Sequence, residues 1–364
     1  VDMAICLSPN GTTTYTGNQP SHEVLVGTVN GVYVIARESL GQWRVARNAL
    51  ASCHVSSLLI EPRSGKTFCG THWGTLYASA NLGNTWEVKN NGVTQDHVYS
   101  LGRTEVDGKV KLFAGTEPAH LFTSDDLGEN WNELPALRLV PSVPNWTFPA
   151  APHVAHVKNI TFDPLDSRTI YIGIEQGGLL KSEDQGSTWR ELHGFHDDVH
   201  RLLIRRSDPK WLYISSGDGL FNSRDGGESW EQLTTRSMRI GYPDALFIHP
   251  DREELMFMAG GINAPSKWRF TGDANATIAR SRDAGRSWEI VANGLPEHMQ
   301  ASIEAMAMEV YEGSFALFAG NSDGEIYSSE DEGNHWAKII DGLPPISKGR
   351  HYQGLREGAR ARAV

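Results

Sequence analysis

The sequence has little cysteine and no long apolar run. It contains 3 cysteines in 364 residues, namely Cys6, Cys53 and Cys69. An odd, low count argues against a disulfide framework and favours a reducing compartment. No segment approaches the roughly 20 apolar residues that cross a bilayer. The first residues also lack a charged stretch followed by an apolar one. We therefore expect a cytoplasmic protein that does not bind membranes.

Basic charge is also scarce. Lysine and arginine number 33 against 44 acidic residues, which gives a net charge of −11. The one basic stretch is Arg356, Arg360 and Arg362 at the end of the chain. Because nucleic acids are bound through clustered Lys and Arg, the charge balance excludes them as expected partners.

The pattern Ser-x-Asp-x-Gly-x-x-Trp recurs along the chain. Intact copies begin at Ser124, Ser182, Ser223, Ser281 and Ser329. A sixth copy begins at Ser79 with Asn81 in place of Asp, and a degenerate seventh surrounds Gly41 and Trp43. Successive motif tryptophans lie 41 to 58 residues apart, a spacing that suits four strands per repeat. The repeats predict an all-β fold, a seven-bladed β-propeller that forms one domain over residues 1–364.

Each motif is predicted to form the hairpin between the third and fourth strands of its blade. The Asp can accept hydrogen bonds from turn amides, the Gly allows a positive φ, and the Trp packs between sheets. A group repeated in every blade serves folding, so we do not expect these Asp residues to be catalytic or to bind metal.

These motifs resemble those of the BNR/Asp-box propellers, which include sialidases, xyloglucan-cleaving glycosidases, sortilin-type receptors and photosystem II assembly factors. The resemblance implies the fold but no single activity, because this fold carries unrelated functions. Sialidases have an Arg-Ile-Pro motif near their start, and this sequence has none, so sialidase activity is not expected. The xyloglucan enzymes resemble two such propellers in tandem, whereas this chain has one.

Ligands of propellers usually bind at the mouth of the central channel, where the inner strands begin. The inner strands align on an apolar-x-x-apolar core. The residues before this core are His54, His97, His156, Asp198, Tyr242 and Ser302. The stretch Tyr352-Gln-Gly-Leu355, preceded by His351, fits the same frame. We therefore predict that a C-terminal strand joins the first blade and closes the ring.

This frame brings four histidines to equivalent places. We predict that His54, His97, His156 and His351 hold a divalent transition metal, Zn, Fe or Mn. The loops between second and third strands add the candidate catalytic residues His72, Glu117 and Glu175, as general bases or as groups that orient the ligands.

Two alternatives stay open for these histidines. They can instead bond neighbouring backbone at the strand starts. A register slip of one residue would also replace them with His153, His196 or His200.

Two functions follow. The first is a metal-dependent hydrolase or lyase, with oxygenase chemistry possible, that acts on a small polar or aromatic substrate at the mouth. The alternative is a non-catalytic propeller that binds a protein or glycan partner on one face. Two insertions rich in aromatics and proline, 135–152 and 260–277, are candidates for walls of a pocket there.

Overall fold

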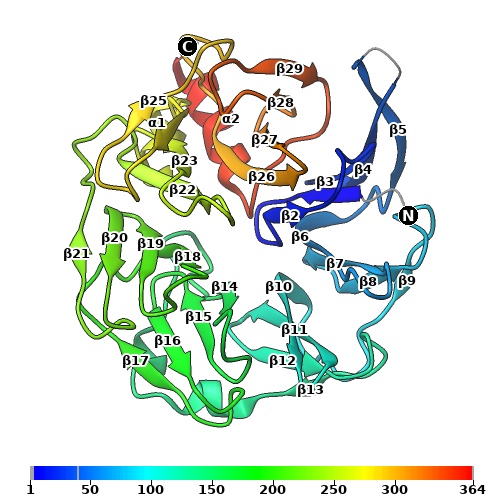
Figure 1. Ribbon diagram of the computed structural model, residues 1–364, viewed down its shortest axis with the longest axis vertical. Helices are drawn as coiled ribbons and strands as arrows, with labels where there is room; N and C mark the ends of the chain where they lie inside the picture. The colour runs from blue at the N-terminus through cyan, green and yellow to red at the C-terminus, as the bar shows by residue number, and fades with distance from the viewer. Residues whose placement is uncertain (1–3, 39–40, 363–364) are drawn as a thin grey trace.

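The computed structural model describes residues 4–38 and 41–362, and in this part of the chain the strands form seven sheets around a central axis (Figure 1). Blade 1 holds β1 (Ala4–Leu7), β3 (Glu23–Thr28), β4 (Gly31–Arg37) and β5 (Trp43–Ala49). Blade 2 holds β6 (His54–Ile60), β7 (Thr67–His72), β8 (Leu76–Ser79) and β9 (Glu87–Val88). Blade 3 holds β10 (His97–Val106), β11 (Lys109–Glu117), β12 (Leu121–Ser124) and β13 (Asn132–Glu133).

The later blades repeat this order. Blade 4 holds β14 (Val157–Phe162), β15 (Ile170–Ile174), β16 (Gly178–Ser182) and β17 (Arg190–Leu192). Blade 5 holds β18 (Val199–Ile204), β19 (Leu212–Ser216), β20 (Gly219–Ser223) and β21 (Glu231–Gln232). Blade 6 holds β22 (Tyr242–Ile248), β23 (Met256–Gly261), β24 (Thr277–Ser281) and β25 (Glu289–Ile290). Blade 7 holds β2 (Thr14–Thr16), β26 (Ile303–Tyr311), β27 (Ser314–Asn321), β28 (Ile326–Ser329) and β29 (Ala337–Ile340). The seven-bladed β-propeller is confirmed.

The repeated motif stabilises the hairpins as predicted. In blade 5, Ser223 Oγ accepts the Gly227 amide (2.8 Å) and donates to Asp225 Oδ1 (2.8 Å). Asp225 Oδ1 also accepts the Ser229 amide (2.9 Å). Gly227 has a φ of 97°, a left-handed conformation that favours glycine. The motif Asp residues therefore serve the turns.

Two of the motif tryptophans bond a neighbouring blade, whereas four others donate to the glycine carbonyl of their own motif. Trp131 of blade 3 is buried, and its Nε1 donates to the carbonyl of Lys89 beyond blade 2 (2.8 Å). Trp336 of blade 7 donates in the same way to Val291 (2.8 Å). Burial of one such side chain contributes on the order of 2–3 kcal/mol. The core is thus a ring of apolar layers between sheets.

The two ends of the chain close the ring. Strand β1 runs parallel to β3 on the inner side of blade 1, and β2 runs parallel to β26 in blade 7. N-terminal strands thus share a sheet with the C-terminal strands β26–β29, which confirms closure by joining of the two ends. The segment assigned to it was wrong, because Tyr352–Leu355 lies in a helix. Since β1 already pairs with the inner edge of β3, no strand position remains there for that segment.

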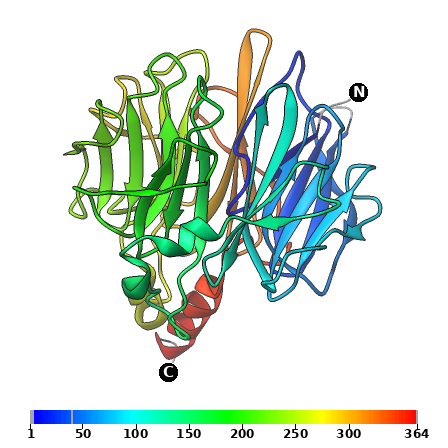
Figure 2. The same ribbon diagram turned by 90° about the horizontal axis from the view of Figure 1, so that it is seen from below.

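The helices gather on one face of the ring, shown at the bottom of Figure 2. They are η1 (Pro135–Leu139), η2 (Val143–Asn145), α1 (Pro265–Thr271) and α2 (His351–Arg362). The inner strands β6, β10, β14, β18, β22 and β26 begin on this same face, which we call the mouth face. None of the helices in the described residues is long and apolar enough to cross a membrane. The predicted insertions contain η1, η2 and α1, so they build this face.

Candidate functional site at the propeller mouth

A β-bulge near the start of each inner strand shapes the mouth. In blades 2 to 7 the pairing register shifts directly after the first core residue, at Val55, Val98, Val157, Val199, Pro243 and Ile303. A bulge leaves one residue unpaired and redirects its side chain. The unpaired residues are Ser56, Tyr99, Lys158, His200, Asp244 and Glu304, and all are buried. The bulges therefore add a second ring of polar side chains beside the predicted one.

A segment from the C-terminal part of the chain enters this ring. Lys348 is fully buried, and its Nζ lies 2.5 Å from Asp244 Oδ1. The Lys348 amide donates to Glu304 Oε2 (2.7 Å), which Ser347 Oγ also contacts at 3.2 Å. His54 Nε2 lies 2.9 Å from the Ser347 carbonyl and must donate, because a carbonyl only accepts. The mouth is thus closed by the chain itself.

The N-terminal segment fills the channel behind the mouth. The buried guanidinium of Arg201, on β18, donates to the carbonyl of Pro9. Ser8 Oγ accepts the amide of Leu58, on β6 (2.9 Å). Segments from the two ends of the chain therefore contact the inner strands near the axis.

Three predicted histidines form a row across blades 2 and 3. The ring centroids of His54 and His72 are 5.3 Å apart, and those of His72 and His97 are 5.4 Å apart. Burial, together with the neighbouring His54, lowers the pKa of His72 to about 3. Burial likewise lowers the pKa of His54 despite its bond to the Ser347 carbonyl. His54 and His72 are therefore uncharged at neutral pH.

Glu117 and Glu175, predicted as catalytic residues, instead hold His156 between them. His156 Nε2 lies 2.8 Å from Glu175 Oε2, and its Nδ1 lies 3.3 Å from Glu117 Oε2. Burial opposes charge on His156, but the two carboxylates outweigh it and raise the pKa. Lys158 Nζ lies 2.6 Å from Glu175, and His97 Nδ1 lies 3.3 Å from Glu117. This arrangement is a buried network of paired charges.

The four predicted metal ligands are not brought to one point. His351 lies at the mouth as predicted, yet it comes from α2, and its Nδ1 lies 3.3 Å from Glu304 Oε1 on the side of blade 7. Within residues 4–38 and 41–362, the only group whose ligand atoms all lie within 4.8 Å of one another is Glu175, Asp198 and His200. Binding of Zn, Fe or Mn by the histidines stays a prediction.

None of the five carboxyls at the mouth is poised as a general acid. A general acid needs a raised pKa so that it carries a proton at neutral pH. Burial alone would raise these pKa values, but neighbouring cations outweigh it. The pKa is lowered at Glu117 (to about 2), Glu175, Asp198, Asp244 and Glu304. All five are ionised bases that already have partners.

Sequence reasoning missed the charged partners of this network. Asp244, Glu304 and Lys348 were not predicted, and neither were Tyr99 and Lys158. The available signal was a polar residue directly after the first core residue of an otherwise apolar strand, as in Val157-Lys158 and Ile303-Glu304. The ring of Tyr99 stacks on His156 with centroids 3.8 Å apart, so these residues form one packed unit.

Large apolar side chains are exposed around the closed mouth. They are Trp73 (50%), Leu139 (82%), Met238 (41%), Ile262 (39%) and Phe270 (70%). All lie on loops or helices of the mouth face. Exposed apolar clusters with polar surroundings mark binding surfaces for macromolecules. This face therefore exposes five large apolar side chains.

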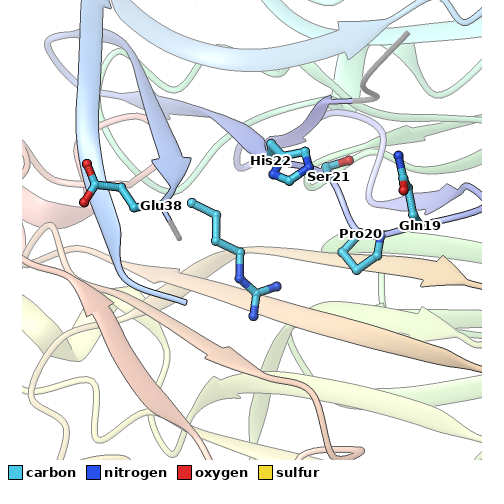
Figure 3. Close-up of a pocket in the computed structure, with 6 residues that line it drawn as sticks. Gln19, Pro20, Ser21, His22 and Glu38 are labelled. Atoms are coloured by element: carbon cyan, nitrogen blue, oxygen red, sulfur yellow. The ribbon is translucent and has the colours of Figure 1, made fainter. Parts of the chain in front are cut away.

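A separate hollow lies at the seam between blades 1 and 7, away from the mouth. Its lining includes Gln19, Pro20, Ser21, His22 and Glu38, which Figure 3 shows, and its volume is about 510 Å³. It lies beside the end of β4, on the face opposite the inner-strand starts. No predicted site residue lines it.

Comparison with known proteins supports the predicted fold and contradicts the predicted function. No family model matches the chain. The chain is 25% identical over 232 residues to a xyloglucanase, Xgh74A of Acetivibrio thermocellus, covering 51% of this chain and 26% of the enzyme. It thus spans about a quarter of that curated relative.

Two solved structures share the fold. An ancestral GH74 enzyme superposes with a TM-score of 0.62 at 16% identity, covering 79% of this chain and 39% of that one. YCF48 bound to a D1 peptide superposes with a TM-score of 0.53 at 14% identity, covering 90% and 88%. The predicted resemblance to Asp-box propellers is confirmed for the fold.

The predicted metal-dependent enzyme for a small molecule is wrong. The curated relatives by sequence include xyloglucanases and a vacuolar protein sorting protein, and none of these is named as a metal-dependent enzyme of small molecules. The alternative of a protein or glycan partner fits the findings better.

Proposed function

We propose that this protein is a non-catalytic propeller that binds a glycan on its mouth face. The observation that carries the proposal is the combination of a mouth closed by paired charges with exposed aromatic and apolar side chains around it. The mouth is occupied by paired charges, whereas its rim offers surface to a chain lying across it. The sequence similarity to xyloglucanases supports a sugar ligand.

Trp73 is the side chain best placed to contact a sugar. It lies in the turn between β7 and β8 with half of its surface exposed, beside His72 and His97. Its φ of 53° is uncommon for a bulky residue, and such conformations gather at binding sites. The C–H face of a pyranose ring packs on the electron-rich face of an indole. Trp73 thus supplies the stacking platform.

Calorimetry with xyloglucan, cello- and pectic oligosaccharides tests the proposal, with a reducing-end assay run on the same mixtures. We expect binding without release of reducing ends. Trp73→Ala should weaken binding at least about tenfold, as loss of a central aromatic contact does. Val88→Ala removes an exposed apolar side chain on the outer strand β9 and should change nothing. Absence of glycan binding, or hydrolysis of the bound glycan, would overturn the proposal.

A protein segment is the second candidate ligand. The observation that favours it is the superposition on peptide-bound YCF48. This superposition covers nearly the whole of each chain, so the two chains match in full and not through a single domain of a larger protein. A peptide array read with wild type and Trp73→Ala tests it. Peptide binding that depends on Trp73, without any glycan binding, would favour this candidate over the first.

A further inference from the structure

A group of unpaired arginines borders Trp73 on the mouth face. The guanidinium of Arg350 lies 5.2 Å from the centre of the Trp73 ring, and that of Arg356 lies 5.4 Å from the ring of Tyr352. On the adjacent α1, Arg269 lies 5.6 Å from the ring of exposed Phe270. The three arginines are exposed. We call these six residues the basic aromatic patch.

Helix α2 links the parts of the patch. The rings of Tyr352 and His54 are 6.4 Å apart, which places the start of α2 beside blade 2 and Trp73. A Cβ on Gly354 would lie 3.9 Å from the amide nitrogen of Arg269, so α1 and α2 touch at this point. Trp268 of α1 also meets the His351 ring, with centroids 5.5 Å apart. Helix α2 therefore connects Trp73 to Phe270.

Its guanidiniums lack acidic partners within the described residues. No carboxylate there lies within ion-pairing distance of Arg269, Arg350 or Arg356. Glu357 follows Arg356 on α2. Burial and Glu325 raise the pKa of Asp323, and the charge of Arg356 only partly lowers it. Lys348, by contrast, is buried and tightly paired. Unpaired guanidiniums on a chain with a net charge of −11 leave anion-binding capacity on this face.

We propose that the basic aromatic patch binds an acidic glycan, a polysaccharide whose sugars carry carboxylates. This inference rests on the proposed function and specifies its ligand. A guanidinium forms paired hydrogen bonds to a carboxylate, while the neighbouring rings accept sugar faces. A neutral glycan would leave these cations without partners.

The test compares three oligosaccharides of similar length by calorimetry: an oligogalacturonate, its methyl-esterified form and a neutral xyloglucan fragment. We expect the oligogalacturonate to bind at least about tenfold more tightly than its ester, because esterification removes the charge. The preference should shrink at high ionic strength, because salt screens exposed charges. Arg350→Gln combined with Arg356→Gln should abolish it, and the matching Lys variants should retain part of it. Arg286→Gln, an exposed arginine on the opposite face, is the matched control.

The outcomes separate this inference from the proposed function. Equal binding of the three oligosaccharides would overturn the acidic ligand and leave glycan binding intact. If none of the three oligosaccharides binds, both the acidic ligand and the proposed glycan binding are overturned. A preference that persists in the double Gln variant would overturn the patch as its location. Binding of an acidic peptide such as oligoglutamate, but of no glycan, would replace the glycan with a protein ligand. Thermal unfolding of each variant checks that the propeller is intact.

Discussion

Lys348→Met is predicted to destabilise the protein strongly at neutral pH. Lys348 is buried 2.5 Å from Asp244 Oδ1, and Asp244 itself is only 5% exposed. The second carboxylate oxygen of Asp244 has no hydrogen-bond partner. Removal of one partner from a buried pair costs about 3–5 kcal/mol, because the remaining charge loses its hydrogen-bonded counterion and gains no solvent. We expect the free energy of unfolding to fall by this amount.

The loss should depend on pH in a defined direction. In the wild type, burial opposes ionisation of Asp244, but the charges of Lys348 and Lys158 outweigh it and lower the pKa. A lowered carboxyl pKa contributes stability above the unfolded value near 4, and this contribution is lost as the pH falls. In Lys348→Met, burial raises the pKa of Asp244, because one of the two lysine charges that oppose this effect is gone. Protonation of Asp244 then removes the unpaired buried charge and its destabilising effect. The difference between wild type and variant should therefore narrow from about pH 7 to about pH 4.

Urea unfolding followed by tryptophan fluorescence measures this difference. Lys348→Met with Asp244→Asn removes the two charges together, and it should recover most of the loss, because a neutral buried pair carries no unpaired charge. Lys338→Met is the matched control, since Lys338 is exposed and its contact with Glu325 (3.1 Å) is screened by water. The reasoning fails if Lys348→Met costs no more than the control, or if the double variant is as unstable as the single one.

Three further predictions concern the fold and the mouth, each checked by the same unfolding measurement. His156→Gln should cost most near pH 6 and progressively less toward pH 9, because a raised histidine pKa contributes stability that is lost as the pH rises through it; a flat pH profile would contradict a charged His156. Asp283→Ala should cost about 1 kcal/mol through loss of its turn hydrogen bonds, and an unchanged midpoint would count against the motif's structural role. Gly294→Ala should cost about 2 kcal/mol or more, because its Cβ would lie 2.0 Å from the Trp336 carbonyl, whereas Gly313→Ala, with a similar φ and open space, should cost only about 1 kcal/mol; equal losses would refute the steric argument.

The fold followed from the sequence because its signal is local. Ser223, Asp225 and Gly227 lie within five residues and bond one another, so the same letters specify the same hairpin wherever they recur. The spacing of the motifs then left room for four strands per blade. The apolar core of each inner strand is also a local pattern, and it correctly placed the residues before it, such as His54 and His156, at the mouth.

The nature of the mouth was decided by the tertiary structure. The inner-strand bulges turn Lys158 and Glu304 toward the axis, and strand alternation alone does not reveal them. Lys348 meets Asp244 across 104 residues of chain, and His351 reaches the mouth on a helix that the sequence frame had assigned to a strand. Contacts between residues so distant depend on how the blades close into a ring, which no local pattern encodes. The repeats thus determined the propeller, and closure of the ring brought together the paired charges at its mouth.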